Sequence, residues 1–367
     1  MRIASLQIEN LRIFEHARIE PAAGINLLVG GNGAGKTTVL EAIALLSSGR
    51  SFRGGVRDAL IRRGQSELRI YGELLVEPEE RRTGVGLSRS LRGWAARIDG
   101  QPVETLTRLF LELAVLCFEP GSHALISGGS EHRRRYLDWA LFHVEPGFIP
   151  VWRRYQRALR QRNALLKQEK PSETIEAWEA ELADQGAQLT RFRERWMHRL
   201  QPGLNAMLER FIPELGPVSV RHSPGWSRSD VAEEDSLRQS LRVARARDQL
   251  LGHTTSGPHR ADWSLSFVPA PVREMLSRGQ EKLVVLSLLL AQAEAFAAVR
   301  GQWPVLVLDD LPSELDPVHL AKTLDWLGEV PAQSFISSTV APALAQVSTR
   351  PSGRFHVEQG QIGALLY

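Results

Sequence analysis

A glycine-rich segment that ends in a lysine and a threonine carries the clearest chemical signal in this chain. It reads Gly30, Gly31, Asn32, Gly33, Ala34, Gly35, Lys36 and Thr37, which fits the pattern Gly-x-x-x-x-Gly-Lys-Ser/Thr at every fixed position. Glycines let backbone N–H groups turn inward around phosphate oxygens. The lysine of such a segment reaches the β- and γ-phosphates, and the next hydroxyl binds Mg²⁺. We predict a nucleoside triphosphate site that includes Thr38; a glycine-rich turn without a ligand is the alternative.

A second segment places acidic side chains after an apolar run. Val305–Leu308 is typical of a buried strand, and Asp309 and Asp310 follow at its C-terminal end, where α/β sheets bind ligands. We expect Asp309 to hold Mg²⁺ together with Thr37. Asp310 is the candidate that polarises the attacking water. Taken alone, a strand that ends in a capping Asp is the simpler interpretation, but the glycine-rich segment favours the catalytic one.

A third segment, Leu276-Ser277-Arg278-Gly279-Gln280, precedes a long apolar helix predicted over 281–299. The Ser277 hydroxyl and the Gly279 N–H would offer hydrogen-bond donors to an anion at the start of that helix. A capped helix start without a ligand explains the same residues equally well.

All these segments together, in this order, resemble the ATP-binding cassette superfamily. Residues 276–280 match its signature, whose common form is Leu-Ser-Gly-Gly-Gln, and Ser313, Glu314 and Asp316 match its D-loop. In that superfamily the signature of one subunit caps the γ-phosphate on the P-loop of the other. The resemblance implies that the nucleotide is ATP and that the catalytic residues are Lys36, Ser277, Gly279, Gln280 and Asp310.

The interval between Lys36 and Ser277 is longer than in transporter ATPases and lacks the very long coiled coils of the structural-maintenance and Rad-type relatives. An insertion of this size resembles the RecF family. Further segments that resemble that family are Asn10–Arg12, Gly49–Arg53, Gly128–Ser130, Arg133–Asp138 and Thr254–Asp262, the last with an internal Gly-Pro-His. The resemblance places Arg12 near the nucleotide.

The same resemblance implies a function in DNA maintenance. We expect an ATP-dependent homodimer that binds duplex DNA and single-strand/duplex junctions, works with RecR and RecO, and promotes recombinase loading at gaps. Roles in replication restart and the SOS response come with the family. Ser338-Thr339 stands where transporter ATPases place a γ-phosphate-sensing His, so we expect only weak, DNA-dependent ATP hydrolysis. Leu11 and Pro312 also depart from the family pattern.

Composition agrees with a globular chain: 43% of residues are hydrophobic, 24% are charged and the net charge is +3. Apolar runs such as Leu283–Leu290 are too short to span a bilayer, and the first residues lack the pattern of a signal peptide. The lone Cys117 excludes an internal disulfide and fits a cytoplasmic location.

Two arginine clusters are candidates for contact with nucleic acid phosphates. Arg133, Arg134 and Arg135 stand in a row, and five arginines lie between Arg153 and Arg162. Such clusters hold phosphate backbones or form ordinary solvated helix faces. We take Arg133, Arg134 and Arg135 as the DNA-binding candidates.

The elements that must position these residues follow from periodicity. Strands are predicted at Ile3–Ile8, Ala17–Ile19, Gly24–Val29 and Ser334–Ser338, a β-meander over 66–100, and a helix over Val39–Leu46. Residues 151–170 and the segment from Ser172 predict a helical hairpin, either a short coiled coil or a pair packed on a neighbouring domain. Residues 212–240 contain Pro, Gly and Ser clusters that indicate loops.

We therefore predict an α/β fold: an ATP-binding-cassette P-loop head (lobe I) built from residues 1–120 and 252–367, with a mostly helical lobe II inserted at 121–251. One alternative is the ATPase subunit of a membrane transporter, which should have a clear Q-loop, the missing His and a shorter interval before the signature. Another is a regulatory module that binds nucleotide without turnover.

Overall fold

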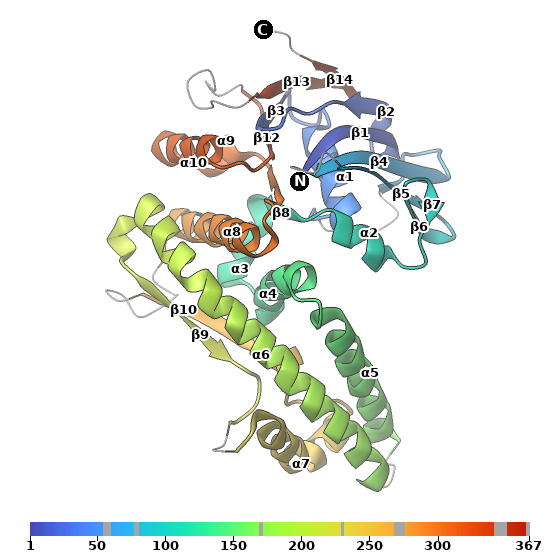
Figure 1. The fold of residues 1–367 in the computed structure, drawn as a ribbon, viewed down its shortest axis with the longest axis vertical. Helices are drawn as coiled ribbons and strands as arrows, with labels where there is room; N and C mark the ends of the chain where they lie inside the picture. The colour runs from blue at the N-terminus through green and yellow to red at the C-terminus, as the bar shows by residue number, and fades with distance from the viewer. Residues whose placement is uncertain are drawn as a thin grey trace. The chain divides into compact units, whose positions relative to one another are not determined.

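The computed structural model describes residues 1–53, 60–76, 81–168, 172–228, 231–267, 276–340 and 351–364. The chain forms two compact units: Met1–His123 with Arg278–Tyr367, and Ala124–Ser277. Figure 1 colours the first unit with both the blue and the red ends of the range, because both ends of the chain build it. Residues 77–80 of the predicted meander and 169–171 of the predicted hairpin lie outside the described residues.

The first unit contains a six-stranded sheet with the order β14-β13-β3-β12-β11-β8. These strands are Gln361–Ala364, Gly353–Glu358, Ile25–Val29, Ser334–Ser338, Val305–Leu308 and Val115–Phe118. All neighbouring pairs are parallel except β13 with β14. The parallel arrangement matters because the C-terminal ends of β3, β12, β11 and β8 all reach the same edge of the sheet.

An antiparallel sheet with the order β2-β1-β4-β5-β6-β7 completes the first unit. Its strands are Phe14–Ile19, Arg2–Leu11, Glu67–Val76, Arg81–Ser90, Gly93–Ile98 and Gln101–Pro102. Strands β4, β5 and β6 form the meander predicted over 66–100. Helix α1 (Lys36–Ser48) packs against strands of both sheets, and buried residues of all three elements form one apolar core. The short helix α2 (Leu106–Glu112) follows the meander.

Three helices complete the C-terminal part of this unit: α8 (Arg278–Arg300), α9 (Leu311–Glu314) and α10 (Pro317–Glu329). Helix α8 is long and apolar enough to cross a membrane by length and composition, with a mean hydropathy of 1.8 in its most apolar window. Two thirds of that window, 67%, is buried inside the structure, which is the pattern of a core helix.

The second unit is mostly helical. Its helices are α3 (Ala124–Ser127), α4 (Ser130–Val144), α5 (Phe148–Lys167), α6 (Ser172–Phe211) and α7 (Glu233–Leu251), and its two strands are β9 (Val218–Ser223) and β10 (Asp262–Phe267). Helices α5 and α6 pack together as the predicted hairpin.

The second unit extends further along the chain than the predicted insertion, to Ser277 rather than residue 251. The reason is that β10 pairs antiparallel with β9 over its whole length, so the strand after residue 252 completes the inserted unit. Within 212–240, Gly216-Pro217 and Pro224–Ser227 lie outside helices and strands, as their composition indicated, while β9 and the start of α7 are regular elements.

A buried ion network holds α5, α6 and α7 together. Arg162 is fully buried in α5 and donates to Asp248 Oδ2 at 2.7 Å, to Glu179 Oε1 at 2.9 Å and to Thr254 Oγ1 at 2.9 Å. Arg245 donates to Glu179 from α7. Every charge in this network therefore has an opposite charge in contact with it.

We predict that Arg162→Met destabilises the protein by about 3 kcal/mol or more, because it leaves Asp248 buried without its cation and removes one of the two cations of Glu179. Arg157→Met on the exposed side of the same helix should change the free energy of unfolding by less than about 0.5 kcal/mol. Urea unfolding of both variants measures the difference. Equal effects would show that the network is not a main support of this unit.

Candidate nucleotide site

The glycine-rich loop joins the end of β3 to the start of α1, as its pattern requires. The Lys36 ammonium donates to the carbonyls of Gly30 and Gly31 at 2.7 and 2.8 Å. Burial lowers the pKa of Lys36, while the nearby Asp310 and Asp309 act in the opposite direction. A Cβ at Gly30 would lie 2.0 Å from the Val357 carbonyl oxygen, so only glycine fits there.

Asp309 is the centre of a hydrogen-bonded group at the edge of the parallel sheet. Its Oδ1 accepts from the Thr37 hydroxyl at 2.9 Å and from the Ser337 hydroxyl at 2.6 Å. Burial raises the pKa of Asp309, and the two hydroxyl contacts partly offset that effect. A hydroxyl and a carboxylate oxygen in contact are the ligand types that Mg²⁺ takes, so Thr37 and Asp309 fit the metal role predicted for them.

Asp310 follows with a left-handed backbone, φ 53°. Its N–H donates to Ser337 Oγ at 2.8 Å, and its Oδ1 accepts from the Ser313 hydroxyl at 2.8 Å. Ser313 thus holds one carboxylate oxygen of Asp310, the residue predicted to polarise water. Pro312 occupies the first turn of α9, where a missing N–H costs nothing.

The other two D-loop residues have structural contacts. Glu314 forms an ion pair with Lys282 of α8, with 2.7 Å between Nζ and Oε2. Asp316 caps α10, since its Oδ1 accepts from the N–H groups of Val318 and His319 at 2.9 and 3.1 Å.

Arg12 lies in the turn between β1 and β2, again with a left-handed backbone, φ 52°. Its guanidinium contacts Glu41 of α1 through two nitrogens, one of them Nη2 at 2.7 Å from Oε1. Ser51 donates to the same Oε1, so the Gly49–Arg53 segment is fixed to α1 through Glu41.

These elements enclose a cleft of about 580 Å³. It is lined by Arg12, Ile13, Asn32, Gly33, Gly35, Lys36, Thr37, Thr38, Phe52, Arg53, Glu119, Pro120, Asp309, Asp310 and Ser337. The structure therefore brings together the predicted P-loop residues, Arg12 and both aspartates. Gly30, Gly31 and Ala34 belong to the same loop without lining the cleft.

Glu119 and Ser337 are two of the three polar lining residues for which the sequence predicted no role at the site, the third being Arg53. Glu119 follows β8 and Ser337 lies in the C-terminal part of β12; both strands neighbour β11, so both residues reach the same sheet edge as Asp309. Burial raises the pKa of Glu119, although the Gly121 N–H donates to its Oε2 at 2.6 Å. Strand order decides their position, and that order is the information a single sequence lacks.

The signature residues do not line this cleft. Ser277 is exposed at the end of the second unit, and Arg278, Gly279 and Gln280 form the first turn of α8. Among the described lining residues of the cleft there is none from 276–280.

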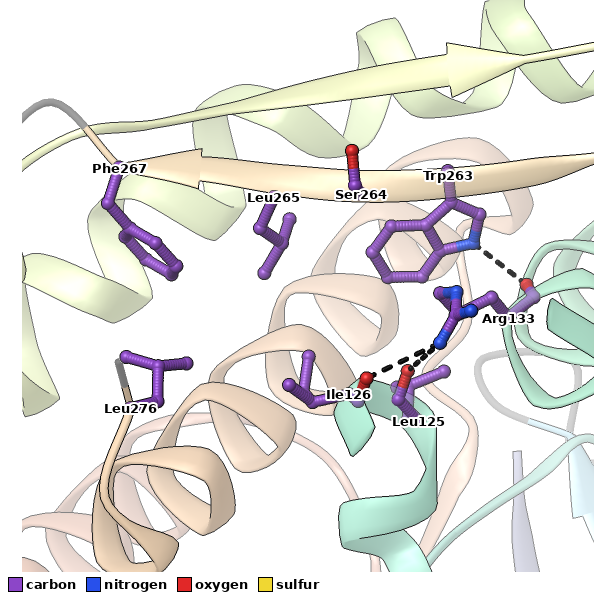
Figure 2. A pocket seen from close by; sticks show the side chains of 8 residues that line it. All are labelled: Leu125, Ile126, Arg133, Trp263, Ser264, Leu265, Phe267 and Leu276. Carbon is purple, nitrogen blue, oxygen red and sulfur yellow. Dashed lines mark hydrogen bonds between the residues drawn. The ribbon is translucent and has the colours of Figure 1, made fainter. Parts of the chain in front are cut away.

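The structure does not support Arg133 as a DNA contact. Its side chain is 5% exposed and pairs with Asp262, with 3.0 Å between Nη2 and Oδ2. Figure 2 shows the guanidinium turned inward, where it donates to the Leu125 and Ile126 carbonyls at 3.3 and 3.4 Å beside the Trp263 ring. Arg133 thereby ties α3 and α4 to β10.

The neighbouring arginines are also engaged. Arg134 is half-buried and donates to Ser130 Oγ and to the Ala261 carbonyl, both at 2.7 Å. Arg135 is exposed and forms an ion pair with Glu131 one turn earlier. Of the three predicted DNA contacts, only Arg135 has the exposure of a surface cation.

The Gly-Pro-His segment also has a structural role. Burial lowers the pKa of His259 to about 4, so the ring is neutral at pH 7. Its Nδ1 accepts from the Tyr155 hydroxyl at 2.6 Å, and its Nε2 donates to the Thr254 carbonyl at 3.0 Å. A Cβ at Gly257 would lie 2.6 Å from that hydroxyl, so the glycine makes room for the contact between Tyr155 and His259.

Comparison with known proteins agrees with this geometry. Residues 2–362 match the family model "RecF/RecN/SMC N terminal domain". The chain is 50% identical to the "DNA replication and repair protein RecF" of Stenotrophomonas maltophilia (strain R551-3), with 100% of both chains covered. It is 36% identical to the protein of that name from Nitrosococcus oceani, with 99% of each covered.

Solved structures show the same fold. The "Structure of the recombination mediator protein RecF-ATP in RecFOR pathway" matches with a TM-score of 0.89 and 24% identity, over 99% of this chain and 97% of the other. The "Crystal structure of the SmcHead bound to the C-winged helix domain of ScpA" matches with a TM-score of 0.61 and 13% identity, over 100% of this chain and 98% of the other.

Fold and site together define an ATP-binding-cassette-type ATPase head with an inserted, mostly helical lobe, so the predicted fold class is confirmed. Within that class, the full-length identity to relatives decides the family. The chain belongs to the RecF family, as its sequence motifs indicated.

We predict that Asp309→Asn stabilises the ligand-free protein at neutral pH by on the order of 1 kcal/mol while it weakens binding of ATP with Mg²⁺. Because burial raises the pKa of Asp309, the folded protein holds this proton more tightly than the unfolded chain. The wild type therefore loses stability as pH rises from the ordinary value of 3.8 through the folded pKa, and the variant does not. Thermal unfolding from pH 4 to 7 and titration calorimetry measure both effects.

The control for the Asp309→Asn variant is Asp325→Asn on the exposed surface of α10, which should unfold like the wild type at each pH. An Asp309→Asn protein that is less stable than the wild type at pH 7 would contradict the assignment of a burial cost to this carboxylate.

We also predict that Arg133→Ala lowers the free energy of unfolding by about 2–4 kcal/mol, because it removes a buried charged hydrogen-bond donor from Asp262 and from the carbonyls of Leu125, Ile126 and Gly128. Arg135→Ala should cost less than about 1 kcal/mol, since its ion pair is exposed. Denaturant unfolding compares the two. If Arg133→Ala instead unfolds like the wild type and changes DNA affinity, the DNA role first predicted for it is restored.

Proposed function

We propose that the cleft binds ATP with Mg²⁺ and hydrolyses it slowly. Lys36 and the loop N–H groups would hold the phosphates, and Thr37 and Asp309 would hold the cation. Asp310, fixed by Ser313, would orient the attacking water as a general base. Ser338 and Thr339, which stand where transporter ATPases have a γ-phosphate-sensing His, offer no basic side chain, and this supports a low hydrolysis rate.

The observation that carries the dimer proposal is that none of the described residues lining the cleft belongs to the signature. One chain supplies the P-loop, both aspartates and Arg12 to the cleft, while Ser277 and Gly279 are not among its lining residues. An ATP-binding-cassette site is complete only when donors face the γ-phosphate from both sides. We therefore propose that two copies bind two ATP molecules, each between the Lys36 of one subunit and the Ser277 of its partner.

The relatives' name supports a role in DNA replication and repair, and "recombination mediator protein" and "RecFOR pathway" in a related structure support recombination. We propose that the ATP-bound dimer binds duplex DNA and single-strand/duplex junctions in the cytoplasm, where hydrolysis releases it. RecR and RecO are the proposed partners, and recombinase loading at gaps, replication restart and the SOS response are the proposed outputs. Membership of the RecF family leaves the transporter alternative without support.

Sedimentation with ATP and Mg²⁺ tests this proposal. The wild type should dimerise, and Lys36→Arg and Ser277→Arg should each remain monomeric and lose about tenfold or more of the ATPase rate. Ser277→Arg should still bind ATP as a monomer, because Ser277 does not line the cleft of its own chain. Ser66→Arg, at another exposed serine, is the control and should dimerise normally.

A wild type that stays monomeric with ATP, or a Ser277→Arg variant that dimerises normally, would show that the signature does not act across subunits. A regulatory module that binds nucleotide without turnover would then describe the protein better.

A further inference from the structure

Helix α5 differs in charge from the other helices of the second unit. Phe148–Lys167 contains five arginines and one lysine and no Asp or Glu. One of these cations, Arg162, is buried in the ion network that joins α5, α6 and α7. The remaining five are exposed, so this helix carries several cations at its surface and no acidic side chain of its own.

The exposed cations of α5 share one face. Its buried positions, Tyr155, Ala158, Arg162 and Leu166, follow helical spacing along the packed side. Arg153, Arg157, Arg160 and Lys167 lie on the opposite side at spacings of four, three and seven residues, which a helix places in one row. With a rise of about 1.5 Å per residue, this row is about 21 Å long. We call these four residues the α5 basic row.

Several arginines elsewhere in this unit have carboxylate partners, and Arg157 and Arg160 contrast with them. Arg191 pairs with Glu234, Arg195 with Glu145, and Arg238 with Asp184. No acidic side chain within the described part of the chain pairs with Arg157 or Arg160. Like charges one turn apart repel each other, so the row favours an external partner that carries several negative charges.

The helix that carries the row is held rigidly. Arg162 connects it to α6 and α7, and Tyr155 connects it to His259 at 2.6 Å. A fixed row of cations loses little conformational freedom when it meets a regular array of charges.

A protein partner fits this surface poorly, because stable protein interfaces have an apolar centre. The face offers only Trp152, 41% exposed, at its edge. A DNA strand carries one phosphate per base at about 3.4 Å along the helix axis, and proteins bind it by neutralising these charges with Lys and Arg. We infer that the α5 basic row binds the phosphodiester backbone of DNA, in place of the Arg133–Arg135 cluster. This inference rests on the proposed DNA function and names the surface that serves it.

The test compares Arg157→Gln/Arg160→Gln with Arg191→Gln/Arg195→Gln, which removes two ion-paired arginines of the same unit. Fluorescence anisotropy measures the affinity of the full-length proteins, with ATP and Mg²⁺, for labelled duplex and single-stranded oligonucleotides at several salt concentrations. The α5 variant should lose on the order of tenfold in affinity, and its slope of log affinity against log salt should fall by about two. The control should keep the wild-type slope. Loss in the duplex arm alone assigns the row to duplex DNA, and equal loss in both arms assigns it to the shared backbone.

Two further readouts separate the possible failures. The α5 variant should unfold and dimerise with ATP like the wild type, since the replaced side chains are exposed and paired with no described carboxylate. If the wild type binds DNA and the α5 variant keeps its affinity and salt slope, the inference is wrong and the proposed function stands. If the wild type itself does not bind either oligonucleotide, the proposed DNA function fails, and the inference fails with it.

Discussion

The hydrogen bond between Thr37 and Asp309 is the contact on which the rest of the site depends. The two residues are far apart in the chain, and their contact requires β3, β12 and β11 to be parallel neighbours in that order. Ser337 comes from the middle strand and donates to the same carboxylate oxygen at 2.6 Å. Because the register of β12 with β3 and with β11 is fixed along several residues, the sheet itself sets the distance between the phosphate loop and the acidic pair.

Short-range sequence patterns were enough to predict the residues that belong to a motif with a fixed spacing along the chain. The P-loop, the strand with its two aspartates and the hairpin of α5 and α6 each depend on neighbours in sequence, and the structure has all of them. Glu119 and Ser337 were not predicted as site residues, because their position at the cleft follows from strand order rather than from a motif. The C-terminal boundary of the inserted unit differed for the same reason: β10 belongs to this unit through its pairing with β9, a contact that no short window of sequence contains.

The arginines show that a short sequence pattern also does not reveal which charged side chains are buried. Three consecutive arginines and a cluster of five look alike in sequence, but their surroundings differ. Arg133 is buried because Asp262 and the end of α3 supply acceptors, and Arg162 because Asp248 and Glu179 do. A buried arginine needs such partners, and they come from distant positions in the chain. The α5 basic row stays on the surface after this pairing, so its exposure follows from the packing of the unit.

The cleft also concentrates features that do not favour stability. Among the described residues, Arg12 and Asp310 are two of the few non-glycine residues with a left-handed backbone, and such conformations cost on the order of 1 kcal/mol each. Burial disfavours the charged forms of Lys36, Asp309 and Glu119 at the same place. A sequence selected for stability alone would replace these groups. Their gathering around a single cleft favours a binding role, because a ligand that carries both phosphates and a cation would match the charges of both signs there.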